Sequence, residues 1–144
     1  MKSLQVNGVS VSAAEGVLVE PVSLAIAPGR PLTLLGETGS GKSLLAQAIM
    51  GILPRELQAH GVVIIHGETY QLPQDVPRLR RLWGRTLASL PQEPWLSLDP
   101  TMPIQQQIAE GYRFVRGQSP VVSEHAAGQD LQQLGLQHAA RRFP

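Results

Sequence analysis

The sequence predicts an α/β fold that begins with an antiparallel β subdomain, continues into a strand–loop–helix core and ends in a helical segment. Three observations predict this class. Two early stretches alternate apolar and polar residues, as half-buried strands do. An apolar run, PLTLL, leads into the glycine-rich GETGSGKS and then into LLAQAIMGI, which favours a helix. Residues 104–134 then consist mostly of helix-forming residues.

Two N-terminal strands are predicted to pair in antiparallel fashion, with a break at Pro21 in the second. Their apolar positions are Leu4, Val6, Val9 and Val11 in the first, and Val17, Val19, Val22, Leu24 and Ile26 in the second. A later hairpin is expected to pair residues 62–65 with 69–72 across a Gly67-Glu68 turn.

The core strand is predicted at residues 32–35, buried on both faces of a parallel sheet, because its apolar residues are nearly continuous. The helix after the glycine-rich stretch is expected over residues 42–52, where apolar side chains form a stripe and Pro54 prevents much extension. The local order is therefore strand, glycine-rich loop, helix.

The second half is predicted to be mostly helical. A short basic helix is expected at 76–83, a strand at 85–90, and two helices at 104–115 and 123–134. Between the strand at 85–90 and the helix at 104–115, the segment PQEPWLSLDPTMP contains four prolines, which exclude regular structure. We therefore expect an antiparallel β and nucleotide-binding core over residues 1–90, a connection over 91–103, and the start of a helical subdomain over 104–144.

The composition limits the function classes. With 144 residues, 42% of them hydrophobic and 16% charged, the chain has the size and composition of one globular domain. A formal net charge of +1 provides no field that would draw the whole molecule onto nucleic acid or an anionic membrane. The basic cluster at 78–85 holds one aromatic residue, so a solvated helix face explains it better than a nucleic-acid surface does. No apolar run approaches the length needed to cross a bilayer, so direct membrane insertion is not expected.

GETGSGKS fits the phosphate-binding pattern G-x-x-x-x-G-K-[ST], the P-loop or Walker A motif. Its glycines allow backbone dihedrals that direct successive N–H groups at phosphate oxygens, and the following helix adds free amides and a favourable dipole. Lys42 supplies a positive charge for the β- and γ-phosphates, and the Ser43 hydroxyl is placed to bind Mg²⁺. The alternative is a turn that merely joins a strand to a helix. The candidate nucleotide-binding residues are Gly36, Glu37, Thr38, Gly39, Ser40, Gly41, Lys42, Ser43 and Leu44.

The motif alone leaves kinases, GTPases and transport ATPases open, but its combination with SLPQEPWLSLDPTMPIQQQIAE, about fifty residues further on, narrows the choice. The pair resembles the nucleotide-binding domain of ABC transporters, and it is particularly similar to the ATPase subunits of the oligopeptide, dipeptide and nickel importers. The matching elements are the P-loop, Pro91-Gln92-Glu93-Pro94, Ser97-Leu98-Asp99-Pro100, and Gln107-Ile108 with Glu110.

This resemblance implies ATP and Mg²⁺ as ligands and ATP hydrolysis coupled to solute uptake as the activity. It identifies Gln92 as the Q-loop glutamine, a catalytic residue whose amide reaches the metal or the attacking water. The loop after Gln92 is implied to contact transmembrane permease subunits, and a second nucleotide-binding domain, identical or different, is implied to complete the ATP site. The protein would then be cytoplasmic and peripheral, held at the inner face of the cell membrane by its permease.

The family pattern continues into an LSGG signature, an apolar strand ending in Asp-Glu and a later switch histidine, and these 144 residues contain none of them. We therefore expect the sequence to be truncated before the signature motif, with the second Mg²⁺ ligand and the catalytic base absent. The family also usually has an aromatic residue in the first strands that stacks on adenine, whereas no Phe, Tyr or Trp lies between Met1 and Gly36. Two alternatives stay open: a non-hydrolytic, truncated nucleotide-binding module, and a small P-loop kinase.

Overall fold

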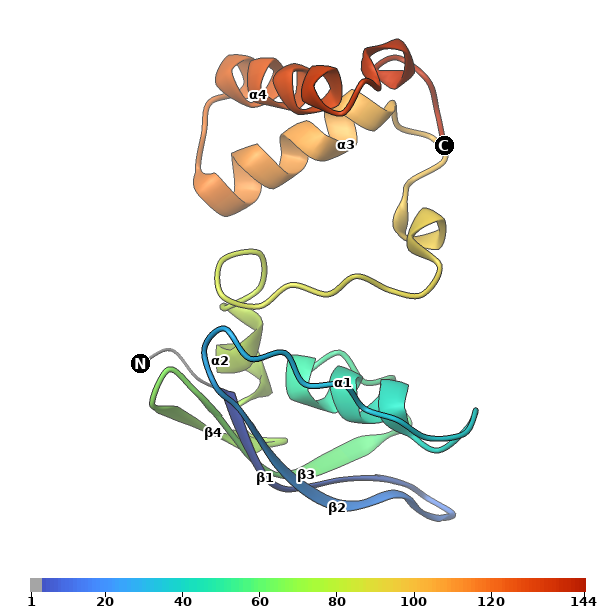
Figure 1. Cartoon of the computed structure of the whole chain (residues 1–144), viewed down its shortest axis with the longest axis vertical. Coiled ribbons are helices and arrows are strands. Elements are labelled where there is room, and N and C mark those ends of the chain that lie inside the picture. Colours follow the sequence, from blue (N-terminus) through green and yellow to red (C-terminus); the bar gives the residue numbers. More distant parts are fainter. Residues whose placement is uncertain (1–3) are drawn as a thin grey trace. The chain divides into compact units, whose positions relative to one another are not determined.

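The computed structural model describes residues 4–144, and the chain divides into two compact units, Met1–Trp83 (unit 1) and Gly84–Pro144 (unit 2) (Figure 1). The chain combines an antiparallel sheet with several helices, which makes it a mixed α/β structure. Among residues 4–144 no helix combines the length and the hydropathy needed to cross a bilayer.

Unit 1 is built on a four-stranded sheet with the order β2-β1-β3-β4, in which every neighbouring pair is antiparallel. The strands are β1 (Leu4–Ala13), β2 (Gly16–Ile26), β3 (Gln58–Ile65) and β4 (Glu68–Leu72). Both predicted antiparallel pairs are present. The break in alternation expected at Pro21 is present as a register shift, since Val22 pairs with Val9 and Val19 with Val11, although β2 runs through Pro21.

The turn of the second hairpin lies one residue earlier than predicted. His66 and Gly67 both have positive φ, 54° and 88°, as the two central residues of a type I′ turn require. The sequence pattern favoured Gly67-Glu68 because histidine is an uncommon residue at positive φ. The observed turn matches the right-handed twist of the strands, and Ile65 consequently pairs with Glu68.

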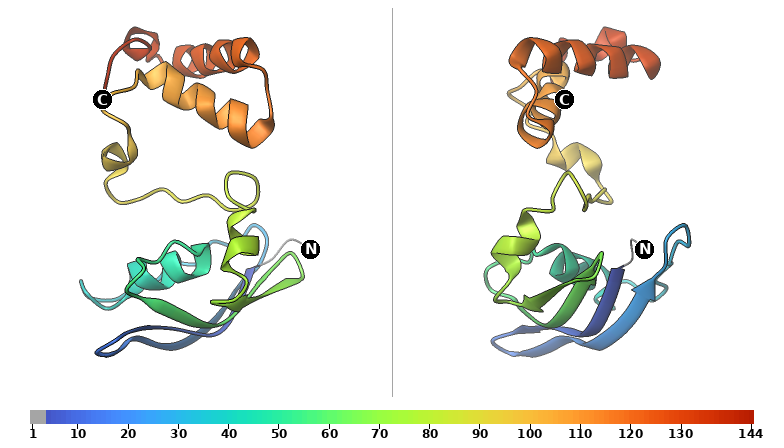
Figure 2. Two further views of the ribbon diagram at one scale, coloured as in Figure 1. Left: turned by 180° about the vertical axis from the view of Figure 1, so that it is seen from behind. Right: turned by 90° about the vertical axis from the view of Figure 1, so that its left-hand side faces the viewer.

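Two helices pack beside this sheet, α1 (Lys42–Met50) and α2 (Val76–Arg80), and Figure 2 shows α1 lying along one face of it. Gly51 ends α1 in the left-handed conformation, so the helix is two residues shorter than expected. The core residues come from both layers: Val6, Val9, Val11, Val63 and Leu79 are fully buried, and Leu45 and Ala48 of α1 are nearly so.

The predicted core strand at 32–35 is wrong. Residues 30–37 form no regular structure, and Leu32, Leu34 and Leu35 are 46%, 41% and 90% exposed. A strand needs a hydrogen-bonded neighbour, and the only sheet among the described residues is antiparallel and does not include this segment. The apolar run therefore leads into the glycine-rich loop as an unpaired extended segment.

Unit 2 is helical, as predicted, and its two main helices are α3 (Ile104–Glu110) and α4 (Pro120–Gln133). The expected single helix at 104–115 changes at Gly111 into a π-helical turn, η2 (Gly111–Val115). The second helix begins three residues before the predicted start, because Ser119 caps it and accepts a hydrogen bond from the Val122 amide. A short 3₁₀ turn, η3 (Gln137–Ala139), follows α4. The helices pack through small and apolar side chains, Ala109, Ala127 and Leu131.

The predicted strand at 85–90 is also wrong. Gly84 has a positive φ of 71° and its amide bonds to the Leu87 carbonyl, which closes a turn where the strand was expected. Leu90 is 86% exposed, so the weakly alternating apolar residues of this segment do not form a buried strand face. The connection at 91–103 is irregular as expected, except for one 3₁₀ turn, η1 (Pro94–Ser97).

Candidate phosphate-binding site

The glycine-rich loop, residues 36–43, joins the extended segment to α1, and its glycines adopt the conformations that their residue type permits. Gly39 and Gly41 have φ of 86° and 85°, in the left-handed region that other residues avoid. Gly41 is also seated on the sheet, because a Cβ atom at this position would lie 2.6 Å from Val19 Cγ2 of β2. The loop is therefore held against β2 at a point where only glycine fits.

Gly36 lies close to two polar side chains of the loop. A Cβ added at this position would lie 2.7 Å from Ser40 Oγ and 3.7 Å from Lys42 Nζ. The loop folds back on itself at this point, and the missing side chain leaves the room for that approach.

The Lys42 ammonium lies inside the curve of the loop. Its Nζ donates to the Gly36 carbonyl at 2.7 Å, to the Glu37 carbonyl at 2.6 Å and to Ser40 Oγ at 3.1 Å. Three acceptors use all three of its N–H donors. The positive charge is thus concentrated at the loop, and an anion that enters must replace some of these acceptors.

The N-terminus of α1 adds backbone donors at the same place. The first bond within the helix runs from the Leu45 amide to the Gly41 carbonyl at 2.9 Å, so the amides of Lys42, Ser43 and Leu44 have no acceptor within the helix. The first turn contains no acidic residue that would occupy this end of the helix dipole. Ser43 is exposed, which leaves its hydroxyl accessible from solvent.

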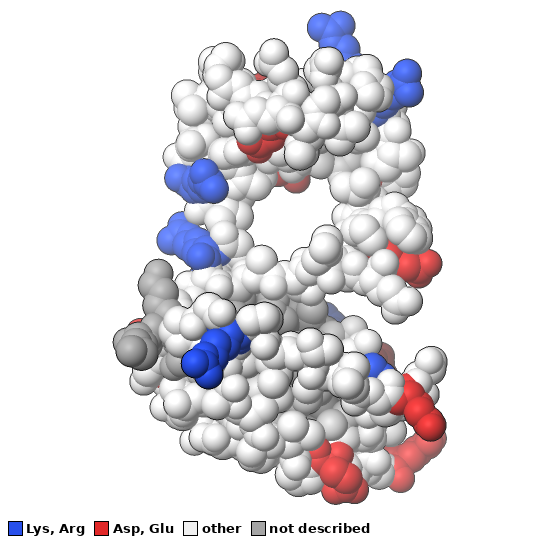
Figure 3. Space-filling model, viewed as in Figure 1, with Lys and Arg blue, Asp and Glu red and all other residues white. Residues whose placement is uncertain are grey.

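The surroundings of the loop carry both signs of charge. Figure 3 shows acidic side chains gathered at the end of unit 1 where β1 turns into β2. Glu37 and Thr38, which the sequence includes in the site, are exposed in the loop itself. Since Glu37 offsets the formal charge of Lys42, attraction for an anion depends on the helix amides and on the placement of the ammonium.

Gln92 belongs to unit 2, whereas the glycine-rich loop belongs to unit 1. The glutamine is exposed and lies in the irregular segment just before η1. Its contribution to a shared nucleotide site therefore stays a prediction. Around it, the segment exposes large apolar side chains: Leu90 at 86%, Trp95 at 60% and Leu96 at 73%.

Two contacts of the basic cluster were not predicted from the sequence. Arg80 Nε donates to the Gly51 carbonyl at 3.0 Å, and Trp83 Nε1 donates to the Met50 carbonyl at 2.9 Å. These carbonyls end α1, so the cluster caps the helix that carries Lys42 in addition to facing solvent. Arg80 and Trp83 lie 29 and 33 residues after their partners, so no local sequence signal indicates this cap.

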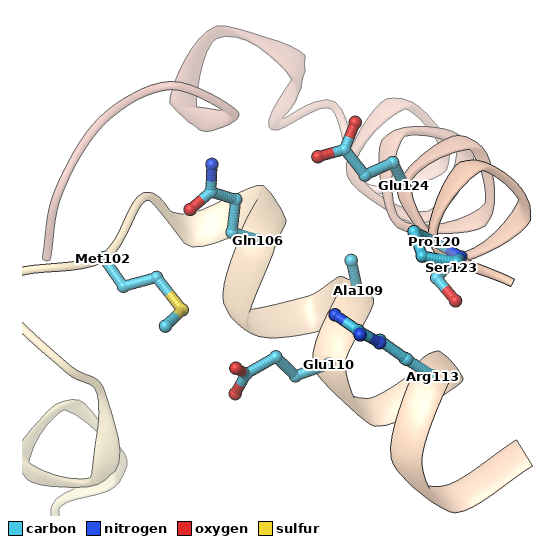
Figure 4. A pocket seen from close by; sticks show the side chains of 8 residues that line it. All are labelled: Met102, Gln106, Ala109, Glu110, Arg113, Pro120, Ser123 and Glu124. Carbon is cyan, nitrogen blue, oxygen red and sulfur yellow. The ribbon is translucent and has the colours of Figure 1, made fainter. Parts of the chain in front are cut away.

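A cavity with a volume of about 200 Å³ lies in unit 2 between α3 and α4 (Figure 4). Charged side chains at its wall are Glu110, Arg113 and Glu124, and Ser123 is 1% exposed. The Ser123 hydroxyl has no hydrogen-bond partner among the described residues. None of the residues that the sequence assigns to a site lines this cavity.

The sheet, the helices and the loop together define an α/β chain that presents a phosphate-binding sequence at the N-terminus of a helix. Residues 19–144 match the family model described as ABC transporter, and the chain belongs to this family. Because the family is established in this way, the kinase alternative is set aside.

Three similar proteins are also named as ATP-binding proteins of transport systems. The chain is 35% identical over 136 residues to a protein of Brucella abortus named for peptide import and ATP binding, and the match covers 90% of this chain and 40% of the relative. It is 31% identical to the peptidoglycan transport ATP-binding protein of Agrobacterium fabrum, covering 97% of this chain and 27% of the relative. It is 30% identical to the oligopeptide transport ATP-binding protein of Mycobacterium tuberculosis, covering 99% and 23% respectively. The chain thus spans less than half the length of these relatives.

Proposed function

We propose that this chain is the ATP-binding part of a peptide importer, in which ATP binding and hydrolysis drive uptake of a peptide or a related solute. The observation that carries the proposal is the glycine-rich loop, where the Lys42 ammonium and the free amides of α1 converge on the same place. The names of the relatives support the transported class, since they refer to peptide, oligopeptide and peptidoglycan transport.

In this proposal the phosphates of ATP are bound by the loop amides and by Lys42. To reach a phosphate oxygen, the ammonium leaves the carbonyls of Gly36 and Glu37 and exchanges them for a charged acceptor. The bonds to the carbonyls already have a charged donor, but a phosphate oxygen also carries a negative charge, and the added Coulomb attraction favours the exchange. The carbonyls that Lys42 leaves are exposed and can bond to water.

The chain offers oxygen ligands of the kind that bind Mg²⁺. In this proposal the exposed Ser43 hydroxyl would be one oxygen ligand, and the carboxamide oxygen of Gln92 would be a second, both of the hard type that Mg²⁺ prefers. When bound, the ion would neutralise charge on the phosphate oxygens. Gln92 would orient the attacking water, because its amide both donates and accepts hydrogen bonds without a change of charge.

The proposal of a permease partner rests on the exposed apolar residues beside Gln92. Trp95 and Leu96 are large, apolar and mostly exposed, and they lie on the 3₁₀ turn that follows the glutamine. Exposed aromatic and aliphatic residues of this kind are typical of protein interfaces. We infer that a transmembrane permease contacts this segment, that a second nucleotide-binding domain completes the ATP site, and that the protein is held at the inner face of the cell membrane in this way.

The test is nucleotide binding by the chain and by its Lys42→Ala variant, measured by calorimetry with ATP and ADP in the presence of Mg²⁺. Loss of a charged hydrogen bond of about 1.5–3 kcal/mol predicts that Lys42→Ala binds at least about tenfold more weakly. Arg81→Ala is the matched control, because it removes one positive charge from an exposed position of unit 1 outside the loop. Equal affinities in wild type and Lys42→Ala would contradict the proposal.

A further inference from the structure

Gln107, on the first turns of α3, makes the most extensive set of side-chain contacts in unit 2. Its Oε1 accepts from the Asp99 amide at 2.8 Å, and its Nε2 donates to the Asp99 carbonyl at 2.8 Å. The same Nε2 donates to the Met102 carbonyl at 2.7 Å. One carboxamide thus binds both polar groups of a single backbone residue and a third group three residues later.

These bonds replace backbone pairing that the connection lacks. Residues 98–103 contain no helix or strand, and Pro100 and Pro103 supply no amide donors. Without Gln107 the Asp99 amide would bond only to water, and the Asp99 carbonyl would keep only the Met102 amide, which donates to it at 3.3 Å. Because a carboxamide matches the donor and acceptor pattern of a peptide group, Gln107 holds Asp99 as a neighbouring strand would.

The first turn of α3 also binds the last part of the chain. The amides of Ile104 and Gln105 donate to the carbonyls of Arg142 and Ala140, at 3.0 and 3.1 Å. The Gln105 side chain donates to the Glu124 carbonyl of α4 at 3.0 Å. The turn that carries Gln107 is therefore held by three hydrogen bonds to two other segments, the end of the chain and α4, and a segment bonded to this turn is restrained with it.

We propose that Gln107 is a positioning residue that fixes the connection, and with it the exposed Trp95 and Leu96, in one orientation relative to α3. Only five residues separate Leu96 from Met102, so immobilising Asp99 restricts the 3₁₀ turn beside it. That this turn is presented to a permease rests on the proposed function. The clamp itself is a property of unit 2 and does not depend on nucleotide.

The test compares Gln107→Ala with wild type by amide hydrogen exchange resolved by NMR and by the fluorescence anisotropy of Trp95, recorded in a Trp83→Phe background. Loss of the bond to the Asp99 amide predicts that this amide exchanges about tenfold faster or more. The anisotropy of Trp95 decreases as its segment becomes mobile. Amides within α3 and α4 keep their protection, which separates a positioning role from general destabilisation.

Two further variants sharpen the comparison. Gln107→Glu keeps an oxygen acceptor for the Asp99 amide but loses the donor to both carbonyls, so protection of Asp99 should be partly retained. Gln106→Ala is the matched control, because this exposed neighbour on α3 lies at the wall of the cavity in Figure 4. Gln106→Ala should leave Asp99 exchange and Trp95 anisotropy unchanged.

Unchanged Asp99 exchange in Gln107→Ala would overturn the proposal, and so would an equal effect of Gln106→Ala. ATP binding is measured on the same samples and should be the same in wild type and Gln107→Ala. A chain that fails to bind ATP but loses Asp99 protection in Gln107→Ala would contradict the proposed function and leave the clamp standing.

Discussion

Val19 in β2 lies directly against Gly41 at the start of α1: a Cβ atom at Gly41 would approach Val19 Cγ2 to 2.6 Å. The sheet therefore determines where the helix begins, and the helix N-terminus determines where the loop amides point. Val19 lies outside the glycine-rich motif, so the geometry of the candidate site depends on a contact that the motif does not contain.

Gly41→Ala should disrupt this arrangement. The variant combines a side chain at φ +85° with a close contact to Val19, and each factor costs about 1–3 kcal/mol. We expect thermal stability to fall and ATP affinity to decrease at least about tenfold, the equivalent of about 1.4 kcal/mol. Calorimetry and thermal unfolding of the same samples measure both quantities.

Gly39→Ala is the control for this prediction, because Gly39 has nearly the same φ but no atom within 4 Å of an added Cβ. It should cost only the conformational part, about 1–3 kcal/mol, and therefore less than Gly41→Ala. Adding Val19→Ala to Gly41→Ala should restore part of the loss. If both glycine variants behave alike, the contact with Val19 has no role.

Leu79→Ala should destabilise unit 1 more than any surface change. Leu79 is fully buried and lies beside Gly51, where an added Cβ would be 3.4 Å from Leu79 Cδ2. Removing a buried leucine side chain leaves a cavity and costs about 2–5 kcal/mol. Denaturant unfolding measures this cost. Leu96→Ala, at a residue 73% exposed, should change stability by less than about 0.5 kcal/mol.

The parts of the fold that the sequence predicts correctly are those with local signals. The β1–β2 and β3–β4 hairpins have alternating apolar residues and short turns, so their partners are neighbours in sequence. The helix after the glycine-rich loop begins at Lys42 as expected and ends early at Gly51, where the backbone becomes left-handed. The pairing of β1 with β3, across about fifty residues, has no such signal in the sequence.

The failures concern segments whose structure depends on partners that local sequence cannot supply. Residues 32–35 have the composition of a buried strand, but without a paired neighbour their carbonyls and amides form no ladder. At the site, the motif predicts a phosphate-binding role for Lys42 and the glycines, and it gives no indication that the ammonium bonds to the Gly36 and Glu37 carbonyls. The Gln107 clamp was missed for a similar reason, since its partners are backbone groups that any residue could provide.

Tyr112→Phe should weaken the attachment of η2 to α4 and reduce the alkaline pH dependence of stability. Tyr112 donates to Asp130 Oδ2 at 2.6 Å, and this bond, followed by burial, raises the pKa of the Tyr112 hydroxyl. A raised pKa in the folded state stabilises the fold below the ordinary tyrosine pKa of about 10, and this contribution is lost as pH rises through the folded pKa. Melting temperatures between about pH 8 and 11 should therefore fall less steeply in Tyr112→Phe than in wild type.

A second variant, at Tyr70, separates the contributions of the two tyrosines to the alkaline pH dependence of stability. Burial, followed by the hydrogen bond to Glu68, raises the pKa of the Tyr70 hydroxyl in unit 1, so the slope should be smaller in the double variant with Tyr70→Phe than in Tyr112→Phe alone. If Tyr112→Phe has the same alkaline slope as wild type, the Tyr112–Asp130 bond does not contribute to stability.

Thr101→Val should raise the pKa of Asp99. The Thr101 hydroxyl donates to Asp99 Oδ1 at 2.7 Å and its amide donates to the same oxygen at 2.8 Å, and these bonds hold the pKa of the Asp99 carboxyl below its usual range. Their stabilising effect is present above the ordinary pKa of about 3.9 and is lost as pH falls through the lower folded pKa. NMR titration of the Asp99 carboxyl should therefore give a higher midpoint in Thr101→Val than in wild type.

The same titration tests whether the clamp and this turn act together. If Gln107 holds the backbone of Asp99 in place, Gln107→Ala should also raise the midpoint, because the carboxylate then meets the Thr101 donors less often. Asp75 is the internal reference, since its lowered pKa depends first on the Gln71 amide and then on Arg78, all in unit 1. A shift at Asp99 in Thr101→Val alone would mean that the turn holds its shape without Gln107, and a simultaneous shift at Asp75 would mean that the change is not local.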